Sequence, residues 1–180
     1  MESVNTIQLI KRAGQGDGDA QALLYRQYNK AMFNICIRMI GSQTDAEDVL
    51  QDVFILAFKN IKQLKQPENF GGWLKRITLN ECIRYGKRSF NWKDMDEHHH
   101  NILDEATEWW TTISLELVHQ EIKGLPDGCR QVFVLYVLED YSHKDIAVNL
   151  GISEGTSKSQ YHRARQILKD RITKQMAKHG

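Results

Sequence analysis

The sequence predicts an all-α protein made of two small helical domains. Hydrophobic residues recur every three or four positions over long stretches, which is the period of a helix with one buried face. Strand-like alternation is absent, and the 180 residues include only two prolines, Pro67 and Pro126. The helical pattern dissolves from residue 91 to residue 110, where acids are frequent. We therefore expect domains at 1–91 and 112–176, joined by a flexible linker at 92–111.

The amino-terminal domain begins with two predicted helices, one from near Thr6 and one from about Asp19 to Met39. The second carries hydrophobic residues at helical spacing that would form its buried face: Ala20, Leu24, Tyr28, Ala31, Ile35 and Met39. Gly41 would end this helix, because glycine readily adopts the left-handed conformation that follows many helices.

Capping signals place the next two helices. The sequence TDAE at 44–47 is typical of a capping box, in which the Thr44 hydroxyl accepts from the backbone N–H of Glu47. The third helix would start there and continue to about Asn60. After a loop containing Pro67, Asn69 would cap a fourth helix that ends near Ser89.

The carboxy-terminal domain has the pattern of a helix-turn-helix. A helix from about 112 to 124 precedes one opened by Pro126, which suits a first helical turn. Ser142 would cap the next helix, Gly151 would form a left-handed turn after it, and Ser153 would cap the last helix. A helix, a glycine turn and a second helix at this spacing are typical of the DNA-binding motif.

Charge is segregated along the chain, although the net charge is only +1. Residues 59–93 hold nine Lys or Arg against two acids, and residues 156–180 hold seven against one. Between them, residues 94–127 hold nine acids against one lysine. This pattern predicts two sites for a polyanion, separated by a connector that repels it.

Several classes of protein are disfavoured. No run of 18 apolar residues occurs and the first residues lack a signal peptide's apolar core, so we expect a cytoplasmic protein without membrane insertion. Cys36, Cys82 and Cys129 are odd in number and widely spaced, which favours buried reduced thiols. The histidines at 98–100 have no cysteine nearby and are interpreted as a solvated patch. We expect no cofactor and no metal site.

An acidic stripe follows the third predicted helix. Asp45, Asp48 and Asp52 recur at three- and four-residue spacing beside a buried stripe. Three further residues would widen the apolar face beyond the needs of one packing partner: Phe54, Ile55 and Phe58. The combination indicates a protein partner with basic residues. Paired carboxylates also occur in catalytic and metal sites, but no histidine or general acid is placed beside these.

The segment 67–90 interleaves aromatic and cationic residues. Its aromatics are Phe70, Trp73, Tyr85 and Phe90, and its cations are Lys75, Arg76, Arg84, Lys87 and Arg88. Asn69, Thr78 and Asn80 add polar groups that can contact base edges. This composition suits single-stranded or melted nucleic acid, because exposed bases stack on rings while cations hold phosphates. The alternative is a purely structural role, which we expect for Trp73 and Ile77.

The last predicted helix has two faces. At about 100° per residue, one face would be buried: Ser157, Tyr161, Ala164, Leu168 and Ile172. The other would present hydrogen-bonding groups: Gly155, Thr156, Ser159, His162, Arg163 and Gln166. Lys158 and Arg165 lie at the edge, within reach of phosphates. A polar face after this turn suits a recognition helix in a major groove, and the alternative is a merely solvated face.

Three stretches together resemble the extracytoplasmic-function (ECF) group of bacterial sigma factors in the sigma-70 family: DAEDVLQDVF, WLKRITLNECIRYGKR, and the segment from LPDGCRQVF to HRARQIL. The similarity runs from about Gly16 to Arg171. It implies a non-enzymatic subunit with helical regions 2 and 4, which directs core RNA polymerase to promoters, reads the −35 element and melts the −10 element. The implied partners are the β′ clamp helices and β flap of core polymerase, promoter DNA and an anti-sigma factor. The free protein would be a monomer.

The resemblance also implies roles for single residues. Polymerase binding would involve the acidic helix: Asp45, Asp48, Gln51, Asp52 and Phe54. The −10 element would be held by Asn69, Phe70, Gly71, Lys75, Arg76, Asn80, Arg84, Lys87 and Arg88, with Asn80 near a flipped base. The −35 element would be read by Gly155, Thr156, Lys158, Ser159, His162, Arg163 and Arg165. Gln160 and His162 stand where many members have Arg or an aromatic residue, so the −35 sequence is not transferable.

Two rival functions remain open. One is a stand-alone helix-turn-helix regulator whose amino-terminal domain senses a signal or dimerises. The other is an enzyme that uses the carboxylates of Asp45, Asp48 and Asp52.

Overall fold

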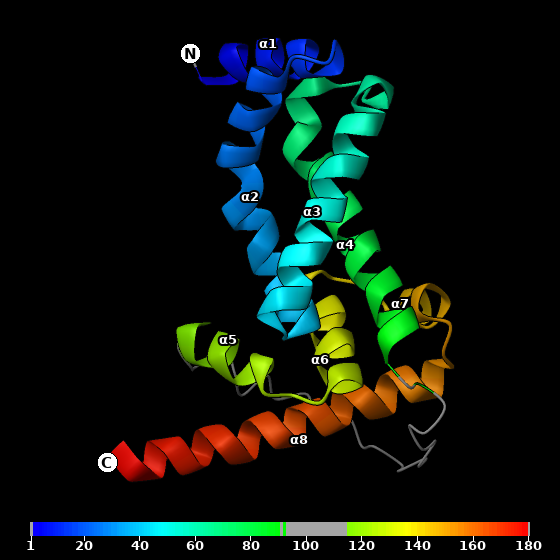
Figure 1. Ribbon diagram of the computed structural model, residues 1–180. Helices are drawn as coiled ribbons and strands as arrows, with labels where there is room; N and C mark the ends of the chain where they lie inside the picture. The colour runs from blue at the N-terminus through cyan, green and yellow to red at the C-terminus, as the bar shows by residue number, and fades with distance from the viewer. Residues whose placement is uncertain (1, 91, 93–114, 180) are drawn as a thin grey trace. The chain divides into compact units, whose positions relative to one another are not determined.

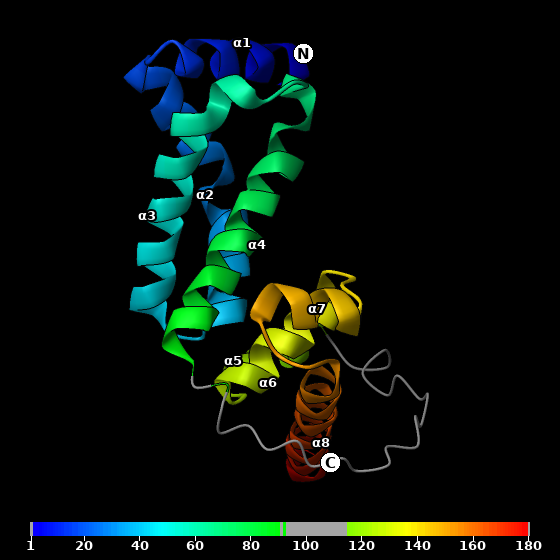
Figure 2. The ribbon, with the colours of Figure 1, turned by 90° about the vertical axis from the view of Figure 1, so that its right-hand side faces the viewer.

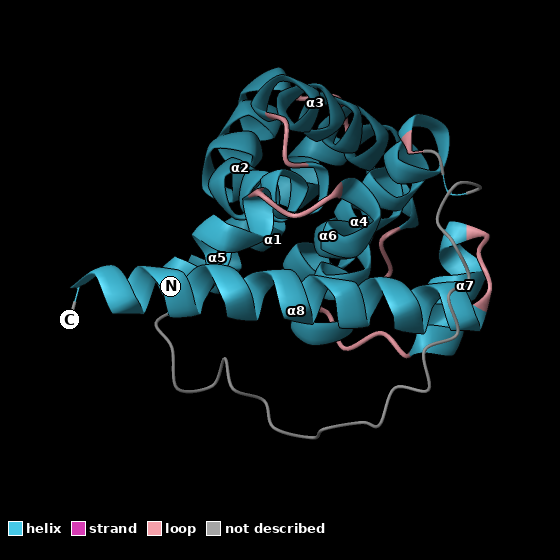
Figure 3. Ribbon diagram, turned by 90° about the horizontal axis from the view of Figure 1, so that it is seen from below, coloured by secondary structure: helices cyan, strands magenta, loops and turns pink. Residues whose placement is uncertain are grey.

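A computed structural model describes residues 2–90, 92 and 115–179 (Figure 1). Within this part of the chain every regular element is helical and none is a strand (Figure 3), so the all-α prediction is confirmed. The described residues form two compact units, Met1–Ile37 with Ser42–Cys82 and Arg38–Gly41 with Ile83–Gly180. The predicted linker beyond Trp92, the histidines at 98–100 and the predicted helix start at Thr112 lie outside the described residues.

The first unit contains α1 (Glu2–Gly14), α3 (Gln43–Asn60) and most of α2 (Gly18–Ile40) and α4 (Phe70–Ser89). The last residues of α2, from Arg38, and of α4, from Ile83, belong to the second unit. Two short 3-10 helices, η1 (Ile61–Gln63) and η2 (Pro67–Asn69), connect α3 to α4. Figures 1 and 2 both show α1 lying across the end of this unit where α3 finishes and α4 starts. The core of the unit includes Leu24, Met32, Ile35, Val49, Val53, Phe70 and Leu74.

The buried face of α2 differs from the prediction at its centre. Ala20, Leu24, Ile35 and Met39 are buried as expected. Ala31 is exposed and Tyr28 is only half-buried, whereas the buried face takes in Met32 and Cys36. The shift of one residue lets the Met32 sulfur meet α4, where the Thr78 hydroxyl lies 3.1 Å from it.

The start of α3 lies earlier than the predicted capping box. Gly41 has a φ of +83° and ends α2, as expected. Ser42 then adopts an extended conformation and its hydroxyl accepts from the backbone N–H of Asp45 at 3.4 Å. The prediction that Thr44 caps this helix is therefore wrong, because the glycine turn places Ser42 at the capping position.

The second unit contains α5 (Leu115–Lys123), α6 (Asp127–Phe133), the π-helical η5 (Val134–Leu138), α7 (His143–Leu150) and α8 (Glu154–His179). Helices α5, α6 and α7 all pack against α8. Pro126 occupies the capping position of α6, one residue before its first turn. The core includes Val118, Ile122, Phe133, Leu135, Ile146 and Leu168. All three cysteines are buried and unbridged, which confirms that prediction.

The helix-turn-helix follows the predicted caps. The Ser142 hydroxyl accepts from the Asp145 N–H at 3.1 Å, and the Ser153 hydroxyl accepts from the Thr156 N–H at 2.9 Å. Gly151 has a φ of +71°, and its N–H donates to the Ala147 carbonyl at 2.9 Å. These three local signals place α8 against α7 in the geometry that the sequence predicts.

Candidate nucleic-acid and protein interfaces

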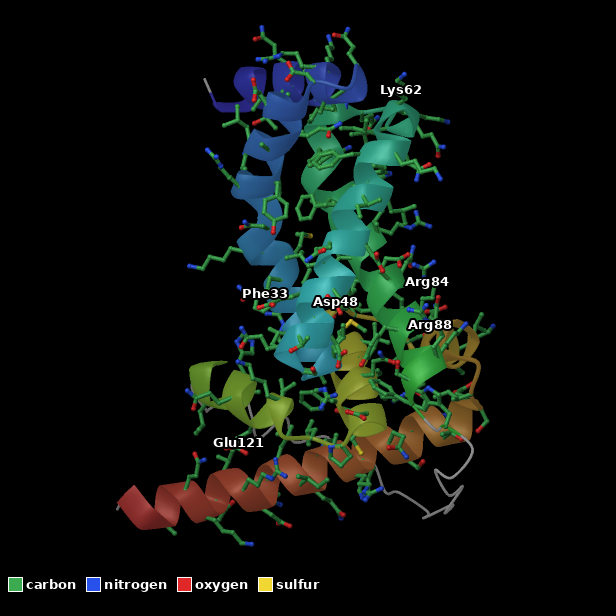
Figure 4. The ribbon with its side chains drawn as sticks, in the orientation of Figure 1. Phe33, Asp48, Lys62, Arg84, Arg88 and Glu121 are labelled. Carbon is green, nitrogen blue, oxygen red and sulfur yellow. The ribbon has the colours of Figure 1, made fainter. Side chains whose placement is uncertain are left out.

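One exposed face of α4 collects most of the residues predicted for melted DNA. At about 100° per residue, Arg76, Arg84 and Lys87 point within about 40° of Asn80. All four side chains are exposed, and Arg88 follows at the edge of the same face. Figure 4 labels Arg84 and Arg88 on the last turns of this helix. The face therefore combines an amide, which can hydrogen-bond a base edge, with a row of cations for phosphates.

Lys75 and Gly71 stand apart from this face. The direction of Lys75 differs from that of Asn80 by about 140°, although its side chain is also exposed. Gly71 is half-buried, and a Cβ added there would lie 3.3 Å from the Tyr28 ring. The structure thus separates Lys75 from the other predicted phosphate ligands, and Gly71 serves close packing against α2.

Two aromatic residues of α4 differ in burial from what their predicted roles require. Phe70 is only 1% exposed and packs edge-on against Tyr28, with ring centres 5.2 Å apart, so it presents almost no surface for the predicted contact with DNA. Trp73, predicted to be core, is half-exposed and points within about 20° of Asn80. Its ring centre lies 5.8 Å from that of Phe70, so the Trp73 ring packs beside the buried Phe70 ring. Ile77 is likewise half-exposed.

Two further polar residues of this segment also differ. Thr78 is fully buried and its hydroxyl donates to the Leu74 carbonyl at 2.9 Å, so it has no access to bases. Asn69 is exposed in η2, where its amide donates to the Gln66 side chain at 2.6 Å. Of the predicted base-contacting groups, Asn69 and Asn80 remain accessible.

Half-buried aromatic rings continue beyond the cationic face of α4. The ring centre of Phe90 lies 5.9 Å from that of Tyr85 and 6.1 Å from that of Trp92. The Trp92 indole N–H donates to the Gly86 carbonyl at 3.2 Å. This hydrogen bond ties the first residue of the predicted linker to the end of α4.

The acidic stripe of α3 is exposed. Asp48, labelled in Figure 4, and Asp52 are exposed, as is Gln51, while Asp45 is half-buried. Ile55 is 66% exposed and lies one turn from Gln51 and Asp52. This surface offers negative charge for a basic partner and one exposed apolar side chain beside it.

Phe54 does not belong to this surface. It is only 4% exposed, and its ring centre lies 4.7 Å from that of Tyr25 and 5.8 Å from that of Phe58. Phe54 shares its side of the helix with buried Leu50 and Ala57, four residues before and three after. Phe54 therefore presents almost no surface for the predicted contact with polymerase, and Ile55 is the exposed neighbour.

The buried face of α8 includes more polar groups than predicted. Thr156 is only 5% exposed, and its hydroxyl lies 2.9 Å from that of Ser153, so it presents almost no surface for the predicted contact with DNA. Gln160 is buried and accepts from the Cys129 thiol at 3.1 Å. Burial raises the pKa of Cys129 to about 11, which keeps this thiol protonated at neutral pH and able to donate.

Tyr161 lies at the edge of the buried face rather than at its centre. Its ring centre is 4.7 Å from that of Tyr136 and 5.6 Å from that of His143. The His143 Nδ1 lies 2.9 Å from the Ser157 hydroxyl, which joins α7 to the first turn of α8. The Arg165 guanidinium lies 5.7 Å from the centre of the Tyr161 ring, a cation–π arrangement.

The outer face of α8 keeps the other predicted residues accessible. Arg163 and Gln166 are exposed, and Gly155, Ser159 and His162 are partly exposed. Lys158 is exposed and pairs with Glu154 at 2.9 Å. A hydrogen bond from Lys158 lowers the pKa of Glu154. Arg163 is the exposed arginine among these residues, and it lies about 60° from buried Gln160, beside the buried face.

The described residues contain neither a metal-binding cluster nor a membrane-spanning helix. In that part of the chain, no group of three or more His, Cys, Asp or Glu side chains could hold a metal ion. None of its helices is both long enough and apolar enough to span a bilayer.

Comparison with known families agrees with this arrangement. Sigma-70 region 2 matches residues 24–89 and sigma-70 region 4 matches residues 115–168. The chain is 31% identical to the ECF RNA polymerase sigma factor SigW of Bacillus subtilis (strain 168) over 176 residues, covering 91% of this chain and 94% of SigW. It is 28% identical to the ECF RNA polymerase sigma-E factor of Haemophilus influenzae, with 91% of this chain and 93% of the relative covered.

Solved structures give a weaker likeness. CnrH in complex with the cytosolic domain of CnrY is 25% identical, with 93% of this chain and 97% of that chain covered and a TM-score of 0.48. The identity to SigW extends over nearly the whole of both chains and includes both matched regions. The chain therefore belongs to the ECF sigma factors of the sigma-70 family, non-enzymatic transcription initiation factors that bind core RNA polymerase and promoter DNA.

Proposed function

We propose that this sigma factor divides promoter recognition between two helices. The exposed face of α4 captures the melted strand of the −10 element, and the outer face of α8 reads the −35 duplex. The observation that carries the proposal is the α4 face itself, where Trp73 and Asn80 share one direction with a row of exposed cations. A protein that reads only duplex DNA has no need of a half-exposed aromatic ring beside a row of cations.

The domain organisation follows the same division. We propose that residues 1–91 act as region 2 and residues 112–176 as region 4, with 92–111 as the flexible connection. The matches at 24–89 and 115–168 support this assignment. Because sigma factors act on polymerase, the protein would work in the cytoplasm, and as a monomer when free.

Binding to core polymerase is assigned to α3. A basic surface on the β′ clamp helices would bind Asp48, Gln51 and Asp52. Ile55 would add an apolar contact at the centre of this interface. A second contact, between region 4 and the β flap, belongs to the same proposal. Polymerase performs the chemistry, so the sigma factor needs only to bind and orient DNA.

The energy of strand opening comes from these contacts. Unstacking and unpairing a base costs a few kcal/mol. Stacking on an aromatic ring returns about 1–3 kcal/mol per base, and each phosphate neutralised by an exposed cation contributes further. Trp73 and Asn80 therefore offset the cost at the captured base, while Arg76, Arg84 and Lys87 hold the flanking backbone.

Replacing Trp73 or Asn80 with alanine is expected to lower promoter opening about tenfold, the effect of losing one stacked or pocketed base. Opening is measured in the holoenzyme by the fluorescence of 2-aminopurine placed in the −10 element. Trp73→Phe keeps a ring and should recover most of the signal. Lys75→Ala is the matched control, because Lys75 is exposed on α4 about 140° away from Asn80. Equal losses for Lys75→Ala and Asn80→Ala would contradict the assignment of the face.

Binding to core polymerase distinguishes the two rival functions from the function of a sigma factor. A stand-alone helix-turn-helix regulator, or an enzyme using the carboxylates of α3, would not associate with core polymerase. Stable association of the purified chain with core polymerase excludes both as the main function, and its absence would refute the sigma factor proposal.

We also propose that an anti-sigma factor holds the protein inactive until a signal releases it. The support is family membership. The tagged chain, purified from its own host without induction, is expected to retain one protein partner in stoichiometric amount. A chain recovered alone, with its promoters constantly active, would contradict this.

A further inference from the structure

We propose that α1 extends the nucleic-acid surface of region 2. Lys11 on α1 and Lys62 on η1 would form a cationic edge that binds the sugar-phosphate backbone of single-stranded DNA beyond the bases captured on α4. This inference rests on the proposed function and adds to it a second contact with the melted strand.

The end of α1 is seated directly on η1. Ile10 and Ala13 are buried and anchor the helix. A Cβ added to Gly14 would lie 3.6 Å from Ile61 Cγ2 and 3.9 Å from Lys62 Cγ, so the α1 backbone and the Lys62 stem are neighbours. Helix α1 also packs against η2, immediately before α4. One rim therefore links α1, η1 and the start of α4, as Figures 1 and 2 show.

Lys11 lies on the same side of α1 as Gly14, three residues later. Because Gly14 meets the Lys62 stem, the Lys11 and Lys62 ammonium groups share this rim. Both side chains are exposed, as is Lys65 in the loop between η1 and η2. Figure 4 labels Lys62 at this end of the unit, beside the end of α3.

Asp17, an acid that follows α1 in the sequence, does not neutralise the positive charge of the rim. Asp17 accepts from the Ala20 backbone N–H at 3.1 Å and pairs with Arg12 at 2.6 Å. The Ala20 N–H, followed by Arg12, holds the pKa of Asp17 below its ordinary value. Among the described residues, Lys11, Lys62 and Lys65 form no ion pair. Glu68 is the only acid in the sequence from 61 to 69, which leaves a surplus of cations.

The position of this surplus favours a DNA strand as the ligand. Helix η2 runs directly into α4, whose first exposed turns carry Trp73 and Arg76. A strand that stacks on Trp73 and passes the amino-terminal end of α4 reaches η2 and then the Lys62 side chain. Lysines without aromatic neighbours recognise the repeating phosphates and not the bases. The rim should therefore bind DNA of any sequence at this position.

The experiment uses holoenzyme and forked DNA carrying the promoter's −35 duplex. The single-stranded −10 segment ends at the captured bases or is extended by several nucleotides on its 5′ or 3′ side. One extension is expected to increase the affinity of the unaltered protein. In the double variant Lys11→Ala/Lys62→Ala this gain should vanish, and the slope of log affinity against log salt should fall by about 1.4 on the extended fork. Lys30→Ala, an exposed lysine of α2, is the matched control and should behave as the unaltered protein.

The outcomes separate the inference from the proposed function. A double variant that keeps the full gain and the full salt slope would overturn the inference, while the opening assay with Asn80→Ala remains valid. If the holoenzyme binds neither fork, the proposed function fails. In that case the inference is tested by the binding of oligo(dT) to the free chain. The inference predicts that the double variant binds oligo(dT) more weakly than the unaltered chain and with a smaller salt slope. Equal binding by both chains would overturn the inference in that case as well.

Discussion

Asparagine at positions 45, 48 and 52 is expected to weaken the binding of core polymerase at least a hundredfold. The three substitutions preserve side-chain volume and remove the negative charge of the exposed α3 face. Close charge pairs across an interface contribute about 1.5 kcal/mol or more each, so the loss of several exceeds about 3 kcal/mol. The fold should persist, because Ser42 still caps α3 through the backbone N–H of Asp45. Binding is measured by titrating labelled core polymerase with each variant.

The matched control for this surface is Glu47→Gln. Glu47 is an exposed acid of α3 whose direction differs from that of Asp52 by about 140°, and it accepts a hydrogen bond from Gln43 at 3.0 Å. Its substitution should leave polymerase affinity within twofold of the unaltered chain, since exposed pairs of this kind contribute about 0.3–0.5 kcal/mol. Unchanged affinity in the triple variant would show that polymerase docks elsewhere. A lost catalytic turnover would favour the carboxylate enzyme.

The second large effect is expected at the exposed arginine of the recognition helix. Arg163→Ala should weaken binding to a duplex containing the −35 element by about 1–3 kcal/mol, the contribution of one bidentate contact between arginine and a base. Arg163 is exposed on α8, whereas Gln160, three residues earlier, is buried against Cys129. The affinity for unrelated duplexes should change far less, because non-specific binding depends on phosphate contacts. Competition between specific and unrelated duplexes measures the difference.

Two further measurements test whether the effect of Arg163→Ala is confined to DNA recognition. Lys169→Ala, an exposed cation further along α8, should reduce specific and unrelated binding equally or leave both unchanged. Core polymerase should bind Arg163→Ala as well as it binds the unaltered chain. If Arg163→Ala lost polymerase, the division of labour between α3 and α8 would be wrong.

The features that the sequence predicted correctly are those that a few neighbouring residues determine. Ser142, Gly151 and Ser153 act within one turn of their own positions, through a hydroxyl that meets a nearby N–H or a backbone that must turn left-handed. The helix-turn-helix could therefore be predicted in detail. The all-α class was predicted equally well, because hydrophobic periodicity extends over whole helices.

The incorrect predictions concern the edges of buried helix faces. There, a shift of one position around the helix decides whether a side chain is buried. Neighbouring residues of a helix differ by about 100°, so the sequence pattern gives a helix face only to within about one position. Phe70 is buried and Trp73 half-exposed because Tyr28 of α2 packs against Phe70. Phe54 is buried because Tyr25 covers it. Each outcome depends on a residue distant in the sequence, which a local pattern does not reveal.

Thr156 shows the same limit in the second unit. The helical angle placed it outward, opposite Tyr161, but its hydroxyl lies beside that of Ser153 inside the cap of α8. The buried face is centred nearer Gln160 because Tyr161 turns toward Tyr136 and His143. The predicted −35 surface is thereby reduced to the side chains that remain accessible, with Arg163 at its border with the buried face.

Run-off transcription over a genomic promoter library tests the central claim most directly. Core polymerase supplemented with this chain should start transcription at a distinct set of sites that share one element near −35 and one near −10. Asn80→Ala should preserve binding to these promoters and lower their opening, whereas Arg163→Ala should lower binding itself. Core polymerase that starts at the same sites with and without the chain would contradict the account.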